Sequence, residues 1–524
     1  MPIRTGFRHI SKPMDTYHFP TSVEQWDIWE LSVPGPETGN PFIEQQIFGE
    51  FYGENEHKTV RGFYDGDGVY RLRFMPAFSG TYHFIVRTSF REEICGTFGV
   101  TSASGGNHGP VRVSSTWHFA YEDGTSYYCL GTTCYVWELQ SYERIQETLK
   151  SLKDTCFNKI RFCIFPKHYI FNLVDPPTFP YEGTPMDAQI LTEENFHLYS
   201  GKSNGSCWDF TRFCCRHFQQ VEYAIGELMK LGIEADLILL HPYDRWGFSC
   251  MKPEEDDLYF KYAIARFSAF RNVWWSLANE YDFMYHKAES DWERLARIIC
   301  VEDPYGHLRS IHNGRQFYDY RRPWITHCSI QRQEAVLSAE HTDEWRKMYQ
   351  KPVVLDEICY EGNLMFGWGN ISGRELVRRF WEGFLRGGYP GHGETLLSPD
   401  EVLWWSHGGK LKGESWKRFR FLYDIIASVP GRGIAPYDFH WEYTCGTPES
   451  EQECKVKSWY LLYFGFKRPA YMDFFFEDNV EFEIHVIDTW NMSIEPAGIG
   501  KGNFRVLLPG REYMCIRLMK KKGV

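Results

Sequence analysis

Two acidic residues close two short apolar segments of this sequence. Val273–Glu280, Val-Trp-Trp-Ser-Leu-Ala-Asn-Glu, has the pattern of a buried strand that ends in an amide and a carboxyl, and Lys351–Glu357 repeats this construction. Burying a carboxyl at the end of an apolar strand costs free energy unless the carboxyl binds a ligand or a partner. Two such carboxyls at the C-terminal ends of barrel strands are what cleavage of a glycosidic bond with retention requires.

The two carboxyls are expected to have different roles. Glu357 is the expected nucleophile, with a nearby cation such as Arg161 helping to keep it charged. Glu280 is the expected acid/base, because a Trp-rich surround and a neighbouring anion both raise the pKa of a carboxyl. We expect the two carboxyls to lie about 5–5.5 Å apart, the separation for direct attack on the anomeric carbon.

Further residues are expected around the same barrel mouth, where the strands end. Asn279 would hydrogen-bond the 2-hydroxyl of the sugar, and one of two neighbouring tryptophans would form the floor of its subsite, while the other points into the core. The expected substrate-binding residues are Asn279, Trp137, Arg161, His241, Asp244, Trp246, His327, His392, Glu394, Trp404 and Trp405.

Each of these residues also has a purely structural interpretation. His241 and His327 are equally well explained as core histidines with satisfied ring nitrogens, and Arg161 as a residue that holds the barrel mouth together. Asp356 is expected to brace the site rather than to act in it. A metal site built from His312, His327 and His392 with nearby acids is a weaker alternative, and we expect no metal and no cofactor.

The chain pattern indicates a barrel that can position these residues. Between residues 110 and 430, strand-like and helix-like segments alternate, with eight strand candidates, which is typical of a (β/α)8 barrel. An open doubly wound sheet is the rival. The strands are expected at 126–131, 159–165, 235–240, 273–280, 307–311, 324–328, 353–355 and 388–392, and the helices at 141–154, 210–231, 258–270, 292–299, 334–349, 375–385 and 416–429.

Short alternating strands flank this region on both sides. Residues 1–105 and 435–524 each have the pattern of a β-sandwich, and the polar run 101–109 is the expected linker. The predicted fold class is therefore α/β: a central (β/α)8 TIM barrel, 110–430, between an N-terminal and a C-terminal β-sandwich. The long loop 166–208, rich in Pro, Tyr and Phe, is expected to be functional.

The composition limits the classes of partner. A net charge of −12 argues against binding to nucleic acid, and an aromatic content of 17% fits rings that stack on sugars. The chain shows no apolar leader and no run that could cross a membrane. Fifteen cysteines without a pairing framework favour a reducing, cytoplasmic location. A homo-oligomer is left open.

The two acidic motifs also resemble a known family. Trp274–Asp282 and Pro352–Gly362 resemble the acid/base and nucleophile motifs of clan A glycoside hydrolases, and are more similar to the apiosidase-like, DUF4038-type branch near family 5. Gly131–Trp137 resembles the first-strand motif of that branch, although Thr132 replaces its Asp. His392-Gly-Glu394 and the segment that begins at Trp404 are similar to it as well, and the flanking regions resemble the DUF5060 and DUF5605 sandwiches.

This resemblance implies a retaining mechanism, with Glu280 as acid/base and Glu357 as nucleophile, but it does not fix the sugar. The leading hypothesis is an exo-acting hydrolase of plant or microbial oligosaccharides or glycosides. A non-catalytic carbohydrate-binding protein and a transglycosylase with the same site are the alternatives. A binding protein would not need both acids, whereas a transglycosylase would share the covalent intermediate.

Overall fold

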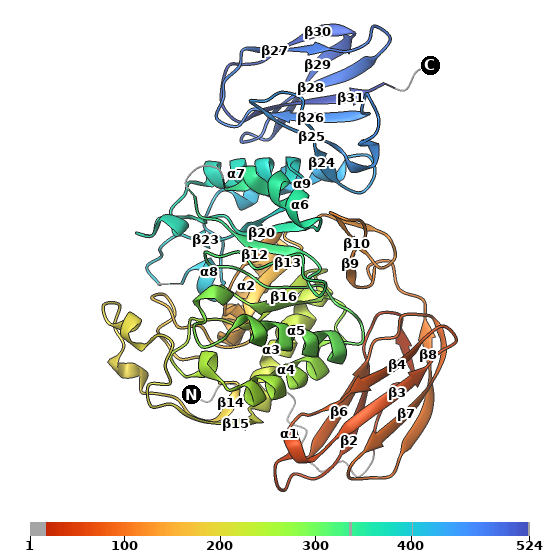
Figure 1. Cartoon of the computed structure of the whole chain (residues 1–524), viewed down its shortest axis with the longest axis vertical. Coiled ribbons are helices and arrows are strands. Elements are labelled where there is room, and N and C mark those ends of the chain that lie inside the picture. Colours follow the sequence, from red (N-terminus) through yellow and green to blue (C-terminus); the bar gives the residue numbers. More distant parts are fainter. Residues whose placement is uncertain (1–16, 335–337, 401, 522–524) are drawn as a thin grey trace.

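Eight parallel strands form the centre of the molecule in the computed structural model, which describes residues 17–334, 338–400 and 402–521 (Figure 1). Each strand except the fifth pairs with the next barrel strand along the chain, and the last pairs with the first. A parallel bridge between His312 and Ser329 links the two remaining edges. The barrel strands are β12 (Gly131–Thr133), β13 (Lys159–Cys163), β16 (Glu234–Leu240), β17 (Val273–Ala278), β18 (Arg309–Ser310), β19 (Cys328–Gln331), β20 (Val353–Glu357) and β22 (Tyr389–His392).

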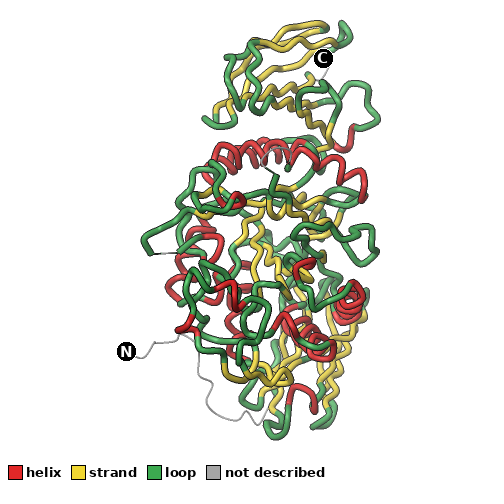
Figure 2. The backbone as a smooth tube through the Cα atoms, turned by 60° about the vertical axis from the view of Figure 1, so that its left-hand side comes forward, coloured by secondary structure: helices red, strands yellow, loops and turns green. Residues whose placement is uncertain are grey.

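The predicted barrel is thereby confirmed, and the open sheet is excluded. Helices surround the strands (Figure 2), except between β18 and β19, where residues 311–327 contain none. The first helix shows why these segments are helical: Ile145, Leu149 and Leu152 recur on one buried face, and the Ser141 hydroxyl caps the first turn. The helices are α2 (Tyr142–Lys153), α3 (Cys215–Lys230), α4 (Pro253–Phe267), α5 (Glu289–Glu302), α6 (Thr342–Tyr349), α7 (Gly373–Leu385) and α9 (Trp416–Ala427).

Several expected elements begin or end elsewhere in the structure. The segment 126–131 starts as β11 (Ser126–Tyr127), which pairs with β10 (Phe119–Tyr121) in a small antiparallel sheet, so the first barrel strand begins only at Gly131. The expected helix 210–231 begins at Cys215, because β15 (Cys207–Phe213) pairs with β14 (Tyr181–Thr184) inside the long loop. Of the expected helix 334–349, residues 335–337 lie outside the described part of the chain.

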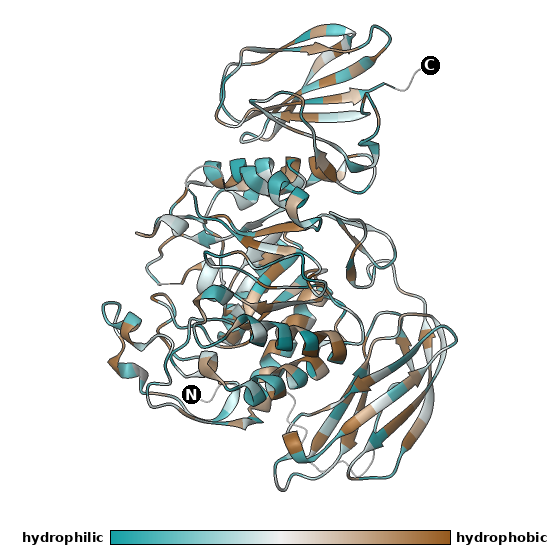
Figure 3. Cartoon of the chain, viewed as in Figure 1, coloured by the Kyte–Doolittle hydropathy of each residue, from teal (hydrophilic) through white to brown (hydrophobic). Residues whose placement is uncertain are grey.

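The N-terminal region forms the predicted β-sandwich. Its two sheets face each other across aromatic side chains such as Trp29 and Phe98, whose ring centroids lie 4.9 Å apart. Buried and partly exposed residues alternate along β2, and Figure 3 shows hydrophobic and hydrophilic residues interspersed along the strands of this region. One sheet holds β1 (Ser22–Glu24), β8 (Ile94–Thr101), β7 (Gly80–Thr88), β3 (Ile47–Tyr52) and β4 (His57–Arg61), and the other holds β2 (Trp29–Pro34), β6 (Val69–Phe74) and β5 (Phe63–Tyr64).

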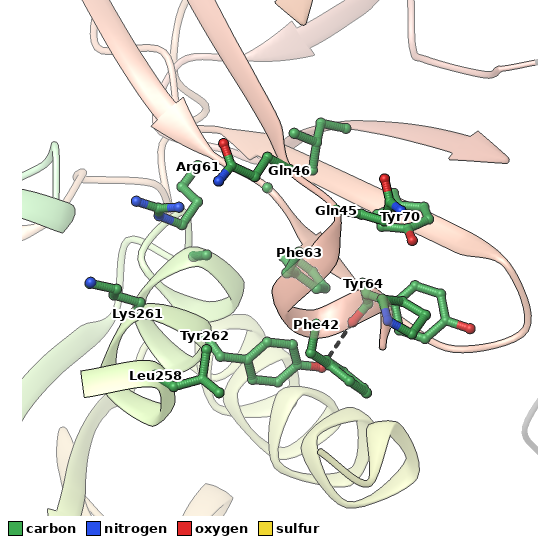
Figure 4. A pocket seen from close by; sticks show the side chains of 14 residues that line it. Phe42, Gln45, Gln46, Arg61, Phe63, Tyr64, Tyr70, Leu258, Lys261 and Tyr262 are labelled. Carbon is green, nitrogen blue, oxygen red and sulfur yellow. Dashed lines mark hydrogen bonds between the residues drawn. The ribbon is translucent and has the colours of Figure 1, made fainter. Parts of the chain in front are cut away.

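Buried ion pairs fix this sandwich to the barrel. The guanidinium of Arg73 on β6 pairs with Glu222 of α3 at 2.7 Å, and that of Arg266 on α4 pairs with Asp65 at the same distance. Beside them the Tyr262 hydroxyl donates to a backbone carbonyl of the sandwich at 3.0 Å, at the edge of a small aromatic pocket (Figure 4). Removing one partner of either pair would leave a buried, unpaired charge, so each pair holds the sandwich in one position on the barrel.

The C-terminal region forms the second predicted sandwich, which packs on α7 (Figure 1). The Trp381 ring of α7 stacks on that of Tyr463 at 5.6 Å. The expected limits of the three domains stay predictions. Among the described residues, no helix is long and apolar enough to cross a membrane. The larger sheet holds β24 (Ile434–Pro436), β25 (Thr444–Pro448), β26 (Trp459–Tyr463), β31 (Met514–Lys520), β28 (Glu481–Asp488) and β29 (Ser493–Lys501), and the smaller one holds β27 (Tyr471–Phe475) and β30 (Asn503–Leu507).

Candidate active site

The end of β17 delivers the first of the two expected carboxyls to the C-terminal face of the barrel. The strand stops at Ala278, and Asn279 and Glu280 follow it into the mouth. Glu280 has a φ of 49°, in the left-handed region that is unfavourable for a side chain with a Cβ. Such strain persists where the surroundings over-determine it, as they do at functional sites.

The Glu280 carboxyl is buried and held by three donors. The Tyr243 hydroxyl and the Asn279 amide, at 3.0 Å, donate to Oε2, and the Gln331 amide donates to Oε1 at 2.9 Å. Burial, together with the negative charge of Glu357, raises the pKa of Glu280 to about 7, although these donors and the Lys167 ammonium act in the opposite direction. At neutral pH this carboxyl can therefore carry a proton and release it.

The second carboxyl, Glu357, ends β20 and accepts different donors. Its Oε1 receives the Tyr135 hydroxyl and the Arg161 guanidinium, whose Nη1 lies at 3.3 Å, while His312 Nε2 lies 3.9 Å away. A cation and a hydroxyl that point at the same oxygen orient this carboxylate, as a nucleophile requires.

One amide joins the two carboxyls. Asn279 accepts from Arg161 Nη1 at 2.7 Å and from the Tyr135 hydroxyl at 3.3 Å, and its own NH₂ donates to Glu280. The two donors to Glu357 thus also hold the amide that holds Glu280. The structure brings the expected residues Asn279, Arg161, Glu280 and Glu357 into one hydrogen-bonded network.

A layer of buried charge lies beneath this network. The Lys159 ammonium donates to Asp236 at 2.6 Å and to Asp356 at 2.8 Å, and Ser329 donates to the other oxygen of Asp356. Although burial opposes it, attraction by Lys159 and Arg161 lowers the pKa of Asp356. Asp356 is thus fully engaged beneath the site and does not face into its mouth.

The two tryptophans point in different directions. Trp404 donates its indole N–H to the Thr132 hydroxyl at 2.9 Å and belongs to the core. Trp405 lies beside the site, where its ring centroid is 5.4 Å from that of Tyr135 and 5.1 Å from that of Trp368. Trp405 is therefore the tryptophan that can face a sugar.

His327 does not lie in the mouth. We expected it at the C-terminal end of the sixth strand, but β19 starts at Cys328, so His327 precedes the strand and lies at the opposite end of the barrel. There its ring is 5.1 Å from that of Trp274, near the start of β17. The expectation failed because the apolar residues at 324–325 belong to the turn before the strand.

Two further candidates face the helices that surround the barrel. His392 is completely buried, with Nδ1 2.8 Å from the Thr132 hydroxyl and its ring 4.8 Å from that of Phe157. Trp137 packs edge-on against Phe162 at 5.7 Å. Neither side chain belongs to the network around the two glutamates.

Two of the expected acids organise loops. Both oxygens of Glu394 accept backbone N–H groups, from Lys412 and Gly413 at 2.7 Å. Asp244 does the same for its own loop, beginning with the N–H of Trp246 at 2.8 Å. Carboxylates whose lone pairs are used in this way position loops rather than ligands. The indole of Trp246 is buried, and its N–H donates to Asp175 of the long loop 166–208 at 3.2 Å.

Several residues of the site were not expected from the sequence. Tyr135, Tyr243 and Gln331 bind the two glutamates. Tyr135 and Tyr243 lie just beyond the ends of β12 and β16, and Gln331 is the last residue of β19. Lys167, from the loop after β13, is the most unusual: its Nζ lies 3.2 Å from the ring centroid of Tyr135. Burial is the main cause that lowers the pKa of nearby His241 to about 3, and the positive charge of Lys167 is the second, so this imidazole is neutral.

No cluster of three or more His, Cys, Asp or Glu side chains that could hold a metal ion occurs among residues 17–334, 338–400 and 402–521. The donor set of the site consists instead of hydroxyls, amides and cations that point at two carboxyls. Such a set is suited to proton transfer and nucleophilic attack at a sugar.

Comparison with known families supports the same chemistry. The model of the apiosidase-like catalytic domain matches residues 114–396, and two domains of unknown function, DUF5060 and DUF5605, match residues 22–89 and 441–519. A search of curated proteins found no match.

Solved structures resemble the whole chain. A crystal structure from Bacteroides vulgatus, provisionally described as a glycoside hydrolase, shares 36% identity with a TM-score of 0.87, over 96% of this chain and 100% of its own. A second structure, described as a glycoside hydrolase, is 15% identical with a TM-score of 0.57, over 81% of this chain and 100% of its own, and supports the fold alone.

Proposed function

We propose that this chain, which belongs to the apiosidase-like family and is a glycoside hydrolase, cleaves its substrate with retention of the anomeric configuration. The observation that carries the proposal is the pair of unlike carboxyls joined through Asn279. Glu280 has a pKa of about 7 because of its burial and the nearby anion. Glu357 instead accepts hydrogen bonds from the Arg161 guanidinium and the Tyr135 hydroxyl.

In the first step, the Glu357 carboxylate attacks the anomeric carbon while Glu280 gives its proton to the departing oxygen. The bond to the leaving group breaks, and a glycosyl ester forms on Glu357. Arg161 and Tyr135 orient the attacking carboxylate through Oε1. The other carboxylate oxygen is the one that can attack.

In the second step, water attacks the anomeric carbon and the ester bond to Glu357 breaks, while Glu280 acts as the base that takes a proton from the water. Esterification removes the charge of Glu357, which is one of the two causes that raise the pKa of Glu280. The pKa of Glu280 therefore falls as soon as the intermediate forms. The same residue thus changes from acid to base at the point where the reaction needs it.

The enclosure of the site supports action at a chain end. Glu280 and Glu357 are only 5% and 7% exposed, and Tyr169 from the long loop packs 5.6 Å from the ring of Trp405. A site enclosed in this way suits the end of an oligosaccharide or a small glycoside better than the middle of a polymer. The proposal therefore includes exo action. Plant or microbial substrates and a cytoplasmic location, which the free cysteines favour, are proposed with it.

Azide rescue of two variants tests the assignment of roles. Glu357→Ala should be nearly inactive on all substrates, and added azide should give the glycosyl azide of inverted configuration. Glu280→Ala should still form the intermediate from a dinitrophenyl glycoside, and azide should restore turnover with retained configuration. Glu394→Gln, which changes a comparably buried carboxyl outside the pair, serves as the control and should give no azide product.

The outcome also decides between the proposal and its alternatives. If azide rescues neither variant, the assignment of the two glutamates is wrong. If both variants keep normal activity or the wild type has none on a broad aryl glycoside panel, the non-catalytic binding protein becomes the better account. Product analysis with added acceptor sugars separates a hydrolase from a transglycosylase.

A further inference from the structure

Lys167 is a buried cation beside the two glutamates, and it has no polar partner among the described residues. The side chain is 4% exposed. Its Nζ faces the rings of Tyr135, Tyr243 and Trp405, at 3.2, 4.3 and 4.5 Å from their centroids. Within the described chain it forms neither an ion pair nor a side-chain hydrogen bond.

Two other buried cations near the site, among the described residues, have carboxylate partners. Arg161 pairs with Glu357 at 3.3 Å, and Lys159 pairs with Asp236 and Asp356 at 2.6 and 2.8 Å. Glu280 is held by neutral donors, and its pKa of about 7 leaves it only partly ionised near pH 7. Lys167 is thus the cation of this set that lacks an anion within ion-pair distance.

Aromatic rings compensate only part of this deficit. Cation–π attraction stabilises an ammonium over a ring face, but it leaves the three N–H donors without acceptors. A buried charge is normally paired and hydrogen-bonded. Lys167 also stays largely protonated near neutrality, because burial lowers its pKa only to about 8.

The position of Lys167 indicates what completes it. Two of the three residues whose rings surround the ammonium also bind the glutamates: the Tyr135 hydroxyl donates a hydrogen bond to Glu357, and the Tyr243 hydroxyl donates one to Glu280. The ammonium therefore lies beside the space between the carboxyls, where the reacting sugar must bind. A neutral hydroxyl would accept one hydrogen bond, whereas a carboxylate would both accept and neutralise the charge.

We propose that Lys167 recognises a carboxylate on the sugar that occupies this space, so that the substrate is a glycoside of a uronic acid. This inference rests on the proposed function and names the substrate class of the same site. The net charge of the chain is −12, so an acidic sugar needs a local cation to bind. Lys167 is then the residue that determines specificity, and the two glutamates perform the chemistry.

Matched pairs of substrates test the proposal. The values of kcat/KM are measured for 4-nitrophenyl glucuronides and galacturonides, in both anomeric forms, against the corresponding glucosides and galactosides. The wild type should prefer one uronide over its neutral counterpart. In Lys167→Met the ratio of the two kcat/KM values should fall by about 30-fold or more, mainly through KM.

A control variant separates the local effect from a general loss of charge. Lys150→Met removes an exposed ammonium on α2 and should leave the preference between uronide and neutral sugar as it is in the wild type. Wild-type cleavage of neutral glycosides without any uronide activity would overturn the proposal and leave the retaining mechanism intact. An equal loss on both substrates of a pair in Lys167→Met would overturn it as well.

A binding measurement covers the case in which the enzyme cleaves none of these substrates. Calorimetry on the wild type and on Lys167→Met compares free glucuronate and galacturonate with glucose and galactose. Tighter binding of a uronate that Lys167→Met abolishes would support the role of Lys167 even if the chain proved to be catalytically silent. No difference between acidic and neutral sugars would overturn the proposal.

Discussion

The hydroxyl of Tyr243 should set the pH at which the enzyme loses activity. It donates to Oε2 of Glu280 and is among the groups that hold the pKa of this carboxyl down to about 7. A hydrogen bond to a charged group contributes about 1.5–3 kcal/mol, and 1.36 kcal/mol corresponds to one pKa unit. Tyr243→Phe, which keeps the ring, should therefore raise the pKa of Glu280 by about one unit or more.

The sign of the effect follows from the role of the acid. Glu280 must be protonated in the first step, so kcat/KM falls as pH rises through the pKa of the free enzyme. The alkaline limb should lie near pH 7 in the wild type and near pH 8 or above in Tyr243→Phe. The assay is the pH profile of kcat/KM on an aryl glycoside whose leaving group needs protonation.

A neighbouring tyrosine provides the control. The ring of Tyr169 packs 5.3 Å from that of Tyr243, but no hydrogen bond joins its hydroxyl to Glu280. Tyr169→Phe should leave the alkaline limb where it is in the wild type. A limb that stays in place in Tyr243→Phe, or moves to lower pH, would refute the assignment of Glu280 as the acid.

Three further predictions concern the surroundings of the pair. Glu357→Gln should lower the pKa of Glu280, since it removes an anion that raises this pKa, and ¹³C NMR titration of the labelled carboxyl measures it; an unchanged pKa would count against the coupling. Lys159→Met should lower the free energy of unfolding by about 3–5 kcal/mol in denaturant titrations, because two buried aspartates lose their cation. Trp405→Ala should reduce kcat/KM by about tenfold or more, whereas Trp405→Phe should retain most of it if the ring faces the sugar.

The sequence predicts the barrel and the placement of its two main carboxyls for one physical reason. Val273–Glu280 and Lys351–Glu357 are apolar runs that end abruptly in acid, and the C-terminal ends of parallel strands meet at one face of a barrel. Hydrophobic pattern alone therefore brings Glu280 and Glu357 to the same mouth. The two sandwiches follow in the same way from their alternating strands.

Residues whose placement depends on the exact ends of strands were harder to predict. His327 was expected in the mouth because the apolar run 324–328 resembles a strand, yet β19 begins at Cys328, one residue after His327. Because the strand was predicted to end at residue 328, Gln331 was not recognised as a strand-end residue, although it ends β19 and donates to Glu280. A short strand gives too few residues for periodicity to fix its register.

The direction of loop side chains was not predictable either. Glu394 has the residue type of a ligand, but the backbone N–H groups of Lys412 and Gly413, in the same segment between β22 and α9, use both of its oxygens. Lys167 has the residue type of a solvated surface cation, but the path of its loop buries it among aromatic rings. Sequence spacing has no information on such paths, because they depend on contacts between segments far apart in the chain.

The anomeric configuration of the first-formed product tests the central claim most directly. ¹H NMR of a reaction with an aryl glycoside, recorded before mutarotation, distinguishes the two anomers of the released sugar. Attack by Glu357 followed by attack of water inverts the anomeric centre twice, so the product should have the configuration of the substrate. A first-formed product of the opposite configuration would contradict the account, because water would then attack directly and Glu357 would not be a nucleophile.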